Sequence, residues 1–90
     1  MATALPCAQV GRTGLQVSRL GLGTAPLTGK NGSIPELQSV VTIRTALAVG
    51  VTLIDTAPMY GAGRSEQRVG VALQGVPRER YVLSTKVGRR

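Results

Sequence analysis

The sequence predicts the α/β class, with an N-terminal hairpin followed by strands and helices that alternate along the 90-residue chain. Two segments carry apolar residues at helical spacing, and each is followed by a short apolar segment bounded by turn residues. Strands that alternate with helices form parallel βαβ units with right-handed crossovers. Aromatic residues make up only 2% of the chain, so the core must be built from Val, Leu, Ile and Ala.

The hairpin is predicted at residues 9–18, where two short segments surround a turn at Thr13 and Gly14. Glycine accepts the positive φ angles that such turns require. The segment RLGLG then predicts the first strand of the parallel sheet, which ends near Leu22, before Pro26.

Residues 33–50 carry the strongest helix signal. Ser33 and Glu36 have the spacing of a capping box, Pro35 suits a first turn, and Gly50 is placed to end the helix. The residues predicted to form its buried face are Leu37, Val40, Val41, Leu47 and Ala48.

Two strands and a shorter helix complete the pattern. Residues 51–55, VTLID, are nearly all apolar, which is typical of a strand buried on both faces. The helix follows at residues 65–75, with Ser65 as its predicted cap and Gly75 as its stop. Residues 80–88 then predict the last strand.

A carboxylate, a phenol and an amine are expected to meet where these strands end. Asp55 ends one strand, Lys86 lies near the end of the next, and Tyr60 is on the intervening loop. Ligands bind at this edge of α/β sheets. A phenol has an ordinary pKa near 10, and a nearby ammonium favours its phenolate form. Each residue alone is more often structural, but together they predict a proton donor and acceptor beside a pocket.

Charge and composition limit the other classes of function. The net charge is +7, but the eleven Lys and Arg residues are scattered and aromatic residues for base stacking are scarce, so specific nucleic-acid binding is not expected. One cysteine, Cys7, excludes an internal disulfide and suits a reducing compartment. No segment predicts a membrane span, a signal peptide or a metal site, so we expect a cytoplasmic protein.

Two long motifs resemble the aldo-keto reductase family. They are LIDTAPMYGAGRSEQRVGVAL and RERYVLSTKVG, which contain Asp55-Thr56-Ala57, Tyr60, Ser65-Glu66, Gly70 with Leu73, and Thr85-Lys86. The segment GRTGLQVSRLGLGTAPL is similar to the family's opening hairpin and first barrel strand. The resemblance extends from about Val10 to Arg89.

This resemblance implies a fold and a chemistry. Residues 1–90 would be the N-terminal portion of a single (β/α)8 TIM barrel, namely the hairpin, three strands and two helices. The family moves hydride between NAD or NADP and a carbonyl or alcohol carbon. Tyr60 would be the general acid/base, Lys86 its partner, and Asp55 the residue that holds Lys86. Gly23, Thr24 and Asp55 would lie near the cofactor.

The motifs look most similar to the branch that contains L-galactose, L-fucose, threo-aldose and pyridoxal dehydrogenases. In that branch a sugar hemiacetal is oxidised to a lactone, so the implied substrate is a small carbonyl compound or a sugar. The sequence does not indicate whether the cofactor is NAD or NADP, in which direction the reaction runs or what the oligomeric state is.

The sequence departs from the family pattern in two ways. The family's fourth catalytic residue is a histidine, and this chain has none. A complete barrel needs about 250 residues, and three strands cannot close one. We therefore expect a truncated member that is poorly stable and inactive alone.

Three alternatives remain. A Rossmann dehydrogenase is disfavoured because Pro26 stands where the phosphate-binding motif requires glycine. A small basic protein could instead bind a partner or nucleic acid without catalysis, and such binding would be lost at high salt. A separate chain could also complete the barrel.

Overall fold

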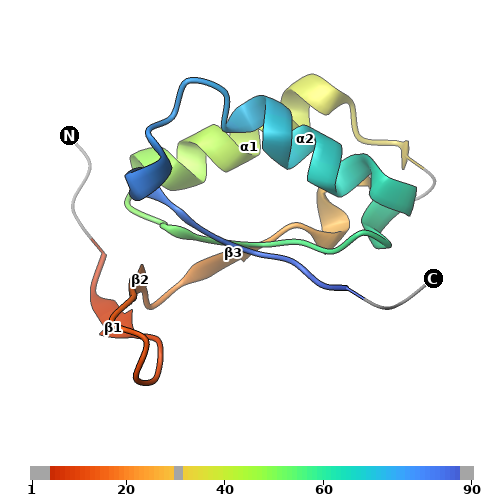
Figure 1. Ribbon diagram of the computed structural model, residues 1–90. Helices are drawn as coiled ribbons and strands as arrows, with labels where there is room; N and C mark the ends of the chain where they lie inside the picture. The colour runs from red at the N-terminus through yellow and green to blue at the C-terminus, as the bar shows by residue number, and fades with distance from the viewer. Residues whose placement is uncertain (1–4, 30–31, 88–90) are drawn as a thin grey trace.

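A three-stranded parallel sheet with two helices on one face forms the centre of the computed structural model, which describes residues 5–29 and 32–87 (Figure 1). The strands are β3 (Gly21–Gly23), β4 (Leu53–Asp55) and β5 (Val82–Ser84), and the helices are α1 (Glu36–Ala48) and α2 (Arg64–Ala72). Both strand pairings are parallel, with β4 in the middle. The predicted alternation of strands and helices is therefore confirmed, although residue 88 of the last predicted strand lies outside the described residues.

The register of the sheet determines which side chains face the helices. Ile54 is fully buried in the apolar core beneath the helices, and Leu22, opposite it on β3, packs against the same core. Successive side chains of a strand point to opposite faces. Asp55 therefore belongs to the face without helices, in the row that also contains Gly23 and Ser84.

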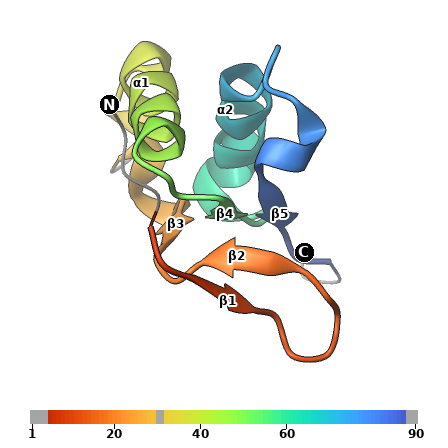
Figure 2. The same cartoon turned by 90° about the vertical axis from the view of Figure 1, so that its left-hand side faces the viewer.

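The hairpin lies at the amino end of the sheet, where Ser18 contacts Thr52, and Figure 2 shows it below the three parallel strands. Its strands are β1 (Cys7–Gln9) and β2 (Gln16–Ser18), so it begins two residues before the predicted range of 9–18. The ladder continues to a bond from Arg19 N to Pro6 O of 2.8 Å, and residues 10–15 form the loop. Ser18 and Thr52 exchange two hydrogen bonds of 2.8 and 2.9 Å, which join the hairpin to the start of β4.

Helix α1 differs from its prediction at its start. Pro35 occupies the N-cap position with extended backbone angles, and no side chain caps the helix, so the predicted capping box of Ser33 and Glu36 is wrong. The end is as predicted, because Gly50 follows the C-cap with a φ of 104°.

The predicted buried face of α1 is also wrong in part. Leu37 and Val41 are 73% and 53% exposed, whereas Ser39 and Ile43 are fully buried. The apolar residues of α1 are distributed around the whole helix, so their spacing in the sequence does not identify which face is buried. Ser39 is accommodated inside because its hydroxyl donates to Leu27 O at 2.5 Å.

Helix α2 begins one residue earlier than predicted. Gly63 is its N-cap, with a left-handed φ of 94°, and Ser65 lies within the first turn, so the predicted cap at Ser65 is wrong. The helix ends at Ala72, and Gly75 adopts a φ of 79° in the turn that follows. The short 3₁₀ helices are η1 (Ala25–Thr28), η3 (Tyr60–Gly63) and η4 (Arg78–Arg80).

A buried arginine joins the two helices. Arg68 of α2 is 9% exposed, and its Nη1 donates to Leu27 O at 3.1 Å, Ile34 O at 2.8 Å and Ser39 Oγ at 2.8 Å. These acceptors offset the cost of removing the guanidinium from water. Arg68 thus connects α2 with η1 and with the start of α1.

The corrected face of α1 can be tested by a pair of substitutions. Ile43→Ala should lower the free energy of unfolding by about 2–5 kcal/mol, because it leaves a cavity in the core. Val41→Ala, on the exposed side, should change it by no more than about 0.5 kcal/mol. Urea denaturation followed by circular dichroism measures both. Should Ile43→Ala fail to fold, Ile43→Val takes its place, with a loss of about 0.5–1.5 kcal/mol. A larger loss of unfolding free energy in Val41→Ala than in Ile43→Ala would support the face of α1 that was predicted from the sequence.

Candidate active site

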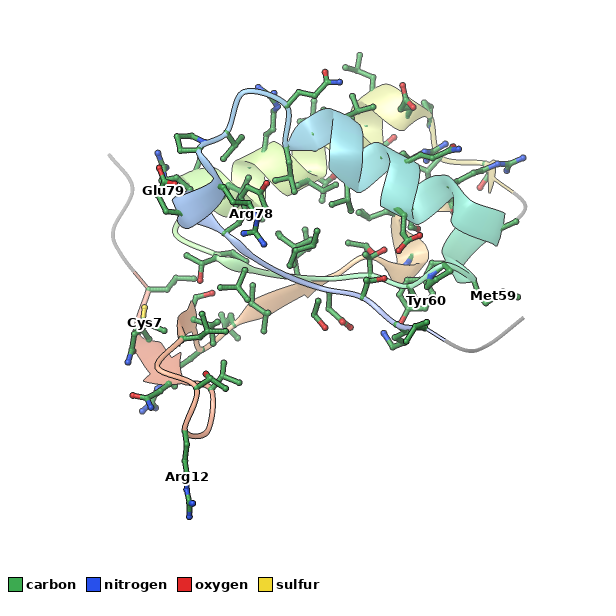
Figure 3. The ribbon with its side chains drawn as sticks, in the orientation of Figure 1. Cys7, Arg12, Met59, Tyr60, Arg78 and Glu79 are labelled. Atoms are coloured by element: carbon green, nitrogen blue, oxygen red, sulfur yellow. The ribbon has the colours of Figure 1, made fainter. Side chains whose placement is uncertain are left out.

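The three residues predicted to act together lie together at the carboxyl edge of the sheet. Asp55 ends β4, Tyr60 begins η3, and Lys86 lies two residues beyond β5. Lys86 Nζ is 3.6 Å from Asp55 Oδ2 and donates hydrogen bonds to Tyr60 Oη at 3.3 Å and to Thr56 O at 3.2 Å. Figure 3 shows Tyr60 at this edge, with Met59 beside it.

The ammonium of Lys86 is the centre of this group. Its hydrogen bond to Tyr60 is the main cause that raises the pKa of Lys86 above 10.5. Desolvation opposes this rise, and the charge of Asp55 makes a smaller contribution that raises the pKa further. The side chains of Lys86 and Asp55 are 53% and 45% exposed, so water reaches both. The arrangement places a phenol, an ammonium and a carboxylate where a ligand can approach them.

A sharply turned segment follows Tyr60. Gly61, Ala62 and Gly63 all have positive φ, of 58°, 55° and 94°. Ala62 adopts a conformation that L-residues with a side chain rarely visit, at a cost of about 1–2 kcal/mol. Gly61 also lies directly against Thr28, because a Cβ there would be 2.6 Å from Thr28 Oγ1. Sequence reasoning missed Thr28, which only the folded chain brings to this loop.

The residues predicted to line a cofactor differ in their surroundings. Gly23 pairs with Asp55 across the sheet, and no other group lies within 4 Å of where its Cβ would be. Thr24 is fully buried, and its hydroxyl donates to Asp55 O at 3.0 Å. The cofactor roles of Gly23, Thr24 and Asp55 stay predictions, and the hydroxyl of Thr24 already has a partner within the protein.

A cavity of about 230 Å³ adjoins Tyr60 and Lys86. Its walls are Ala57, Pro58, Met59, Tyr60, Lys86 and Val87. Met59 was not predicted as a site residue, yet it provides an apolar side chain next to the phenol. Across residues 5–29 and 32–87, no three His, Cys, Asp or Glu side chains are placed to hold a metal ion, and no helix is long and apolar enough to cross a membrane.

Comparison with known proteins identifies the family. A model of the Aldo/keto reductase family matches residues 19–90. The chain belongs to the aldo/keto reductase family. This membership favours the enzyme hypothesis over a small basic binding protein and over a Rossmann dehydrogenase.

Individual relatives match most or nearly all of the chain. L-galactose dehydrogenase from Arabidopsis thaliana is 39% identical over 89 residues, which cover 97% of this chain and 28% of that protein. Pyridoxal 4-dehydrogenase from Microbacterium luteolum is 46% identical over 80 residues, covering 89% of this chain and 23% of that protein. The chain therefore spans about a quarter of the length of these relatives.

A solved structure of the family matches the three-dimensional arrangement. The holo form of an aldo-keto reductase from Bacillus halodurans has a TM-score of 0.84 at 37% sequence identity. The match covers 96% of this chain and 27% of that one. The parallel sheet and its helices thus correspond to part of a larger aldo/keto reductase domain.

The contact between Gly61 and Thr28 predicts a large effect of one added methyl group. Gly61→Ala should lower the free energy of unfolding by about 1–3 kcal/mol, because the new Cβ meets Thr28 and alanine resists a positive φ. Gly70→Ala is the matched control, since Gly70 lies in α2 with open space around it and should gain up to about 1 kcal/mol. Urea denaturation decides, and equal effects of the two changes would contradict the packing described here.

The titration of Lys86 should report its contacts. We expect the pKa of Lys86 to lie above 10.5 and to fall in Tyr60→Phe, which removes the phenolic oxygen, but not in Tyr81→Phe. The protonated form is the one stabilised on folding. Its contribution to stability is therefore complete below pH 10.5 and is lost as the pH rises through the raised pKa. The NMR shift of the Lys86 ε-carbon, followed against pH, measures the pKa. An unchanged pKa in Tyr60→Phe would contradict the hydrogen bond between Lys86 and Tyr60.

Proposed function

We propose that the protein, as its native host produces it, is an oxidoreductase of the aldo/keto reductase family that uses NAD or NADP. The observation that carries this proposal is the group formed by Asp55, Tyr60 and Lys86, with Nζ of Lys86 between the carboxylate and the phenol. Family membership over residues 19–90 supports the same chemistry.

The residues near this group suit a flat nicotinamide ring. Gly23 lies beside Asp55 at the carboxyl edge, with free space where a side chain would stand. The half-exposed carboxylate of Asp55 supplies hydrogen-bond acceptors next to that space. Gly23 and Asp55 would therefore line the cofactor. When bound, the nicotinamide supplies or accepts the hydride at the substrate carbon.

The chain's own residues handle the proton. In reduction, Tyr60 donates its phenolic proton to the carbonyl oxygen as the hydride reaches the carbon, and the reverse transfer accompanies oxidation. The ammonium of Lys86, at 3.3 Å, stabilises the negative charge that develops on the phenolic oxygen. Asp55 holds the ammonium in place from the other side, and Thr56 O adds a third contact.

We further propose that residues 1–90 are the N-terminal portion of a single (β/α)8 TIM barrel domain. In this arrangement β3, β4 and β5 are its first three strands. The parallel register and the placement of both helices on one face support this, as does the match to part of a solved aldo-keto reductase.

The proposed substrates are small carbonyl compounds or sugars. The match to L-galactose dehydrogenase supports oxidation of an aldose. In that reaction Tyr60, in its phenolate form, would accept the proton of the anomeric hydroxyl, and the bound nicotinamide would supply the hydride acceptor, so that the cyclic hemiacetal would become a lactone.

Turnover by the native protein tests the proposal. Absorbance at 340 nm follows oxidation of free aldoses with NAD⁺ or NADP⁺, and reduction of small aldehydes with the reduced cofactors. Tyr60→Phe should lower kcat by about 10²–10⁴-fold, because the proton donor is removed. Tyr81→Phe is the matched control, since that ring packs beside the core and stacks with Arg78, and it should leave kcat nearly unchanged.

Retention of full turnover in Tyr60→Phe would overturn the proposed mechanism. The same assays applied to the isolated 90 residues test the expectation that they are inactive alone.

A further inference from the structure

The loop that carries Tyr60 is attached at both of its ends to one residue, Thr24. At its start, Thr24 N and Thr24 Oγ1 both donate to Asp55 O, each at 3.0 Å. At its end, Ser65 Oγ in the first turn of α2 donates to Thr24 O at 3.0 Å. We call this set of three hydrogen bonds among Thr24, Asp55 and Ser65 the Thr24 clasp.

Burial makes the Thr24 clasp strong. Thr24 and Ser65 are both 0% exposed, so water cannot replace either hydroxyl's partner. A buried donor that loses its acceptor costs about 1–3 kcal/mol, which is more than a hydrogen bond contributes at a surface. The clasp therefore holds the end of β4 and the start of α2 at a set separation, with Thr24, the residue that follows β3, as the link between them.

The position of Tyr60 depends on that separation. The chain leaves β4 at Asp55 and must reach Ser65 through the left-handed turn at residues 61–63. Tyr60 Oη lies 3.3 Å from Lys86 Nζ, a distance that has little room for movement before the hydrogen bond is lost. Asp55, whose carbonyl is in the clasp, also holds Lys86 through its carboxylate.

We propose that Thr24, through the Thr24 clasp, is a positioning residue that fixes the Tyr60 loop so that the phenol stays within hydrogen-bond distance of Lys86. The effect of Thr24 on catalysis rests on the proposed function, whereas its effect on the distance between Tyr60 and Lys86 does not. The proposal gives the hydroxyl of Thr24 a role other than contact with a cofactor, because its proton is already donated to Asp55 O.

The geometry can be measured directly in the native protein. A nuclear Overhauser cross-peak between the Tyr60 ring and the Lys86 ε-protons is assigned by its loss in Tyr60→Phe and in Lys86→Arg. We expect this cross-peak in the unsubstituted chain. Thr24→Val and Ser65→Ala, alone and combined, should weaken or abolish it, and Thr24→Ser should retain it.

Ser18→Ala is the matched control. Ser18 is 1% exposed and also donates to a backbone carbonyl, Leu20 O, but it lies on β2 and contacts neither end of the Tyr60 loop. It should destabilise the protein while leaving the cross-peak intact. Absence of the cross-peak from the unsubstituted chain would overturn the proposal. Persistence of the cross-peak in folded Ser65→Ala, or an equal loss of it in Ser18→Ala, would also overturn the proposal. If Thr24→Val fails to fold, Ser65→Ala and Thr24→Ser decide the question.

Kinetics of the native protein separate positioning from cofactor contact. Thr24→Val should lower kcat by about 10–100-fold, as expected for a displaced catalytic group, with the KM for the nucleotide nearly unchanged. A rise in that KM at constant kcat would instead assign Thr24 to cofactor binding and overturn the proposal. If the cross-peak responds as expected but Tyr60→Phe retains full turnover, the proposed function fails and the structural role of the clasp stands.

Discussion

The position of β4 between two parallel partners is the constraint on which the rest of the structure depends. Its backbone is paired on both sides, and Ile54 is fully buried beneath the helices. Because all three strands run in one direction, the segments that leave them emerge at a common edge. Tyr60 and Lys86, which are 26 residues apart in sequence, come within hydrogen-bond distance there for this reason.

The layer of helices above the sheet depends on polar contacts as well as on apolar packing. A buried guanidinium is costly unless oxygen acceptors surround it. Arg68 has two backbone carbonyls and the hydroxyl of Ser39, which come from three separate segments. The same geometry that satisfies Arg68 holds η1 against α2, and η1 in turn carries Thr28, the residue against which the Tyr60 loop packs.

The contacts of Lys86 are organised for orientation more than for stability. An ion pair between half-exposed groups contributes only about 0–1 kcal/mol, because water screens it. Three acceptors nevertheless surround the ammonium, and they come from the end of β4 and from the loop after it. The Tyr60 loop itself is held at its ends by hydrogen bonds of Thr24 and Ser65, two residues that are 0% exposed, although its left-handed turn is partly open to water.

The sequence by itself determined the order of strands and helices, because apolar spacing and turn residues such as Gly50 act locally. It also determined the grouping of Asp55, Tyr60 and Lys86, since strand ends share an edge once the strands are parallel. Tertiary structure decided which face of α1 is buried and how both helices begin. The buried hydroxyl of Ser39 donates to Leu27 O and accepts from Arg68, 29 residues away, and the hydroxyl of Thr24 donates to an acceptor 31 residues away. Bonds over such distances leave no periodic signal in the sequence, because they exist only after the segments have packed together.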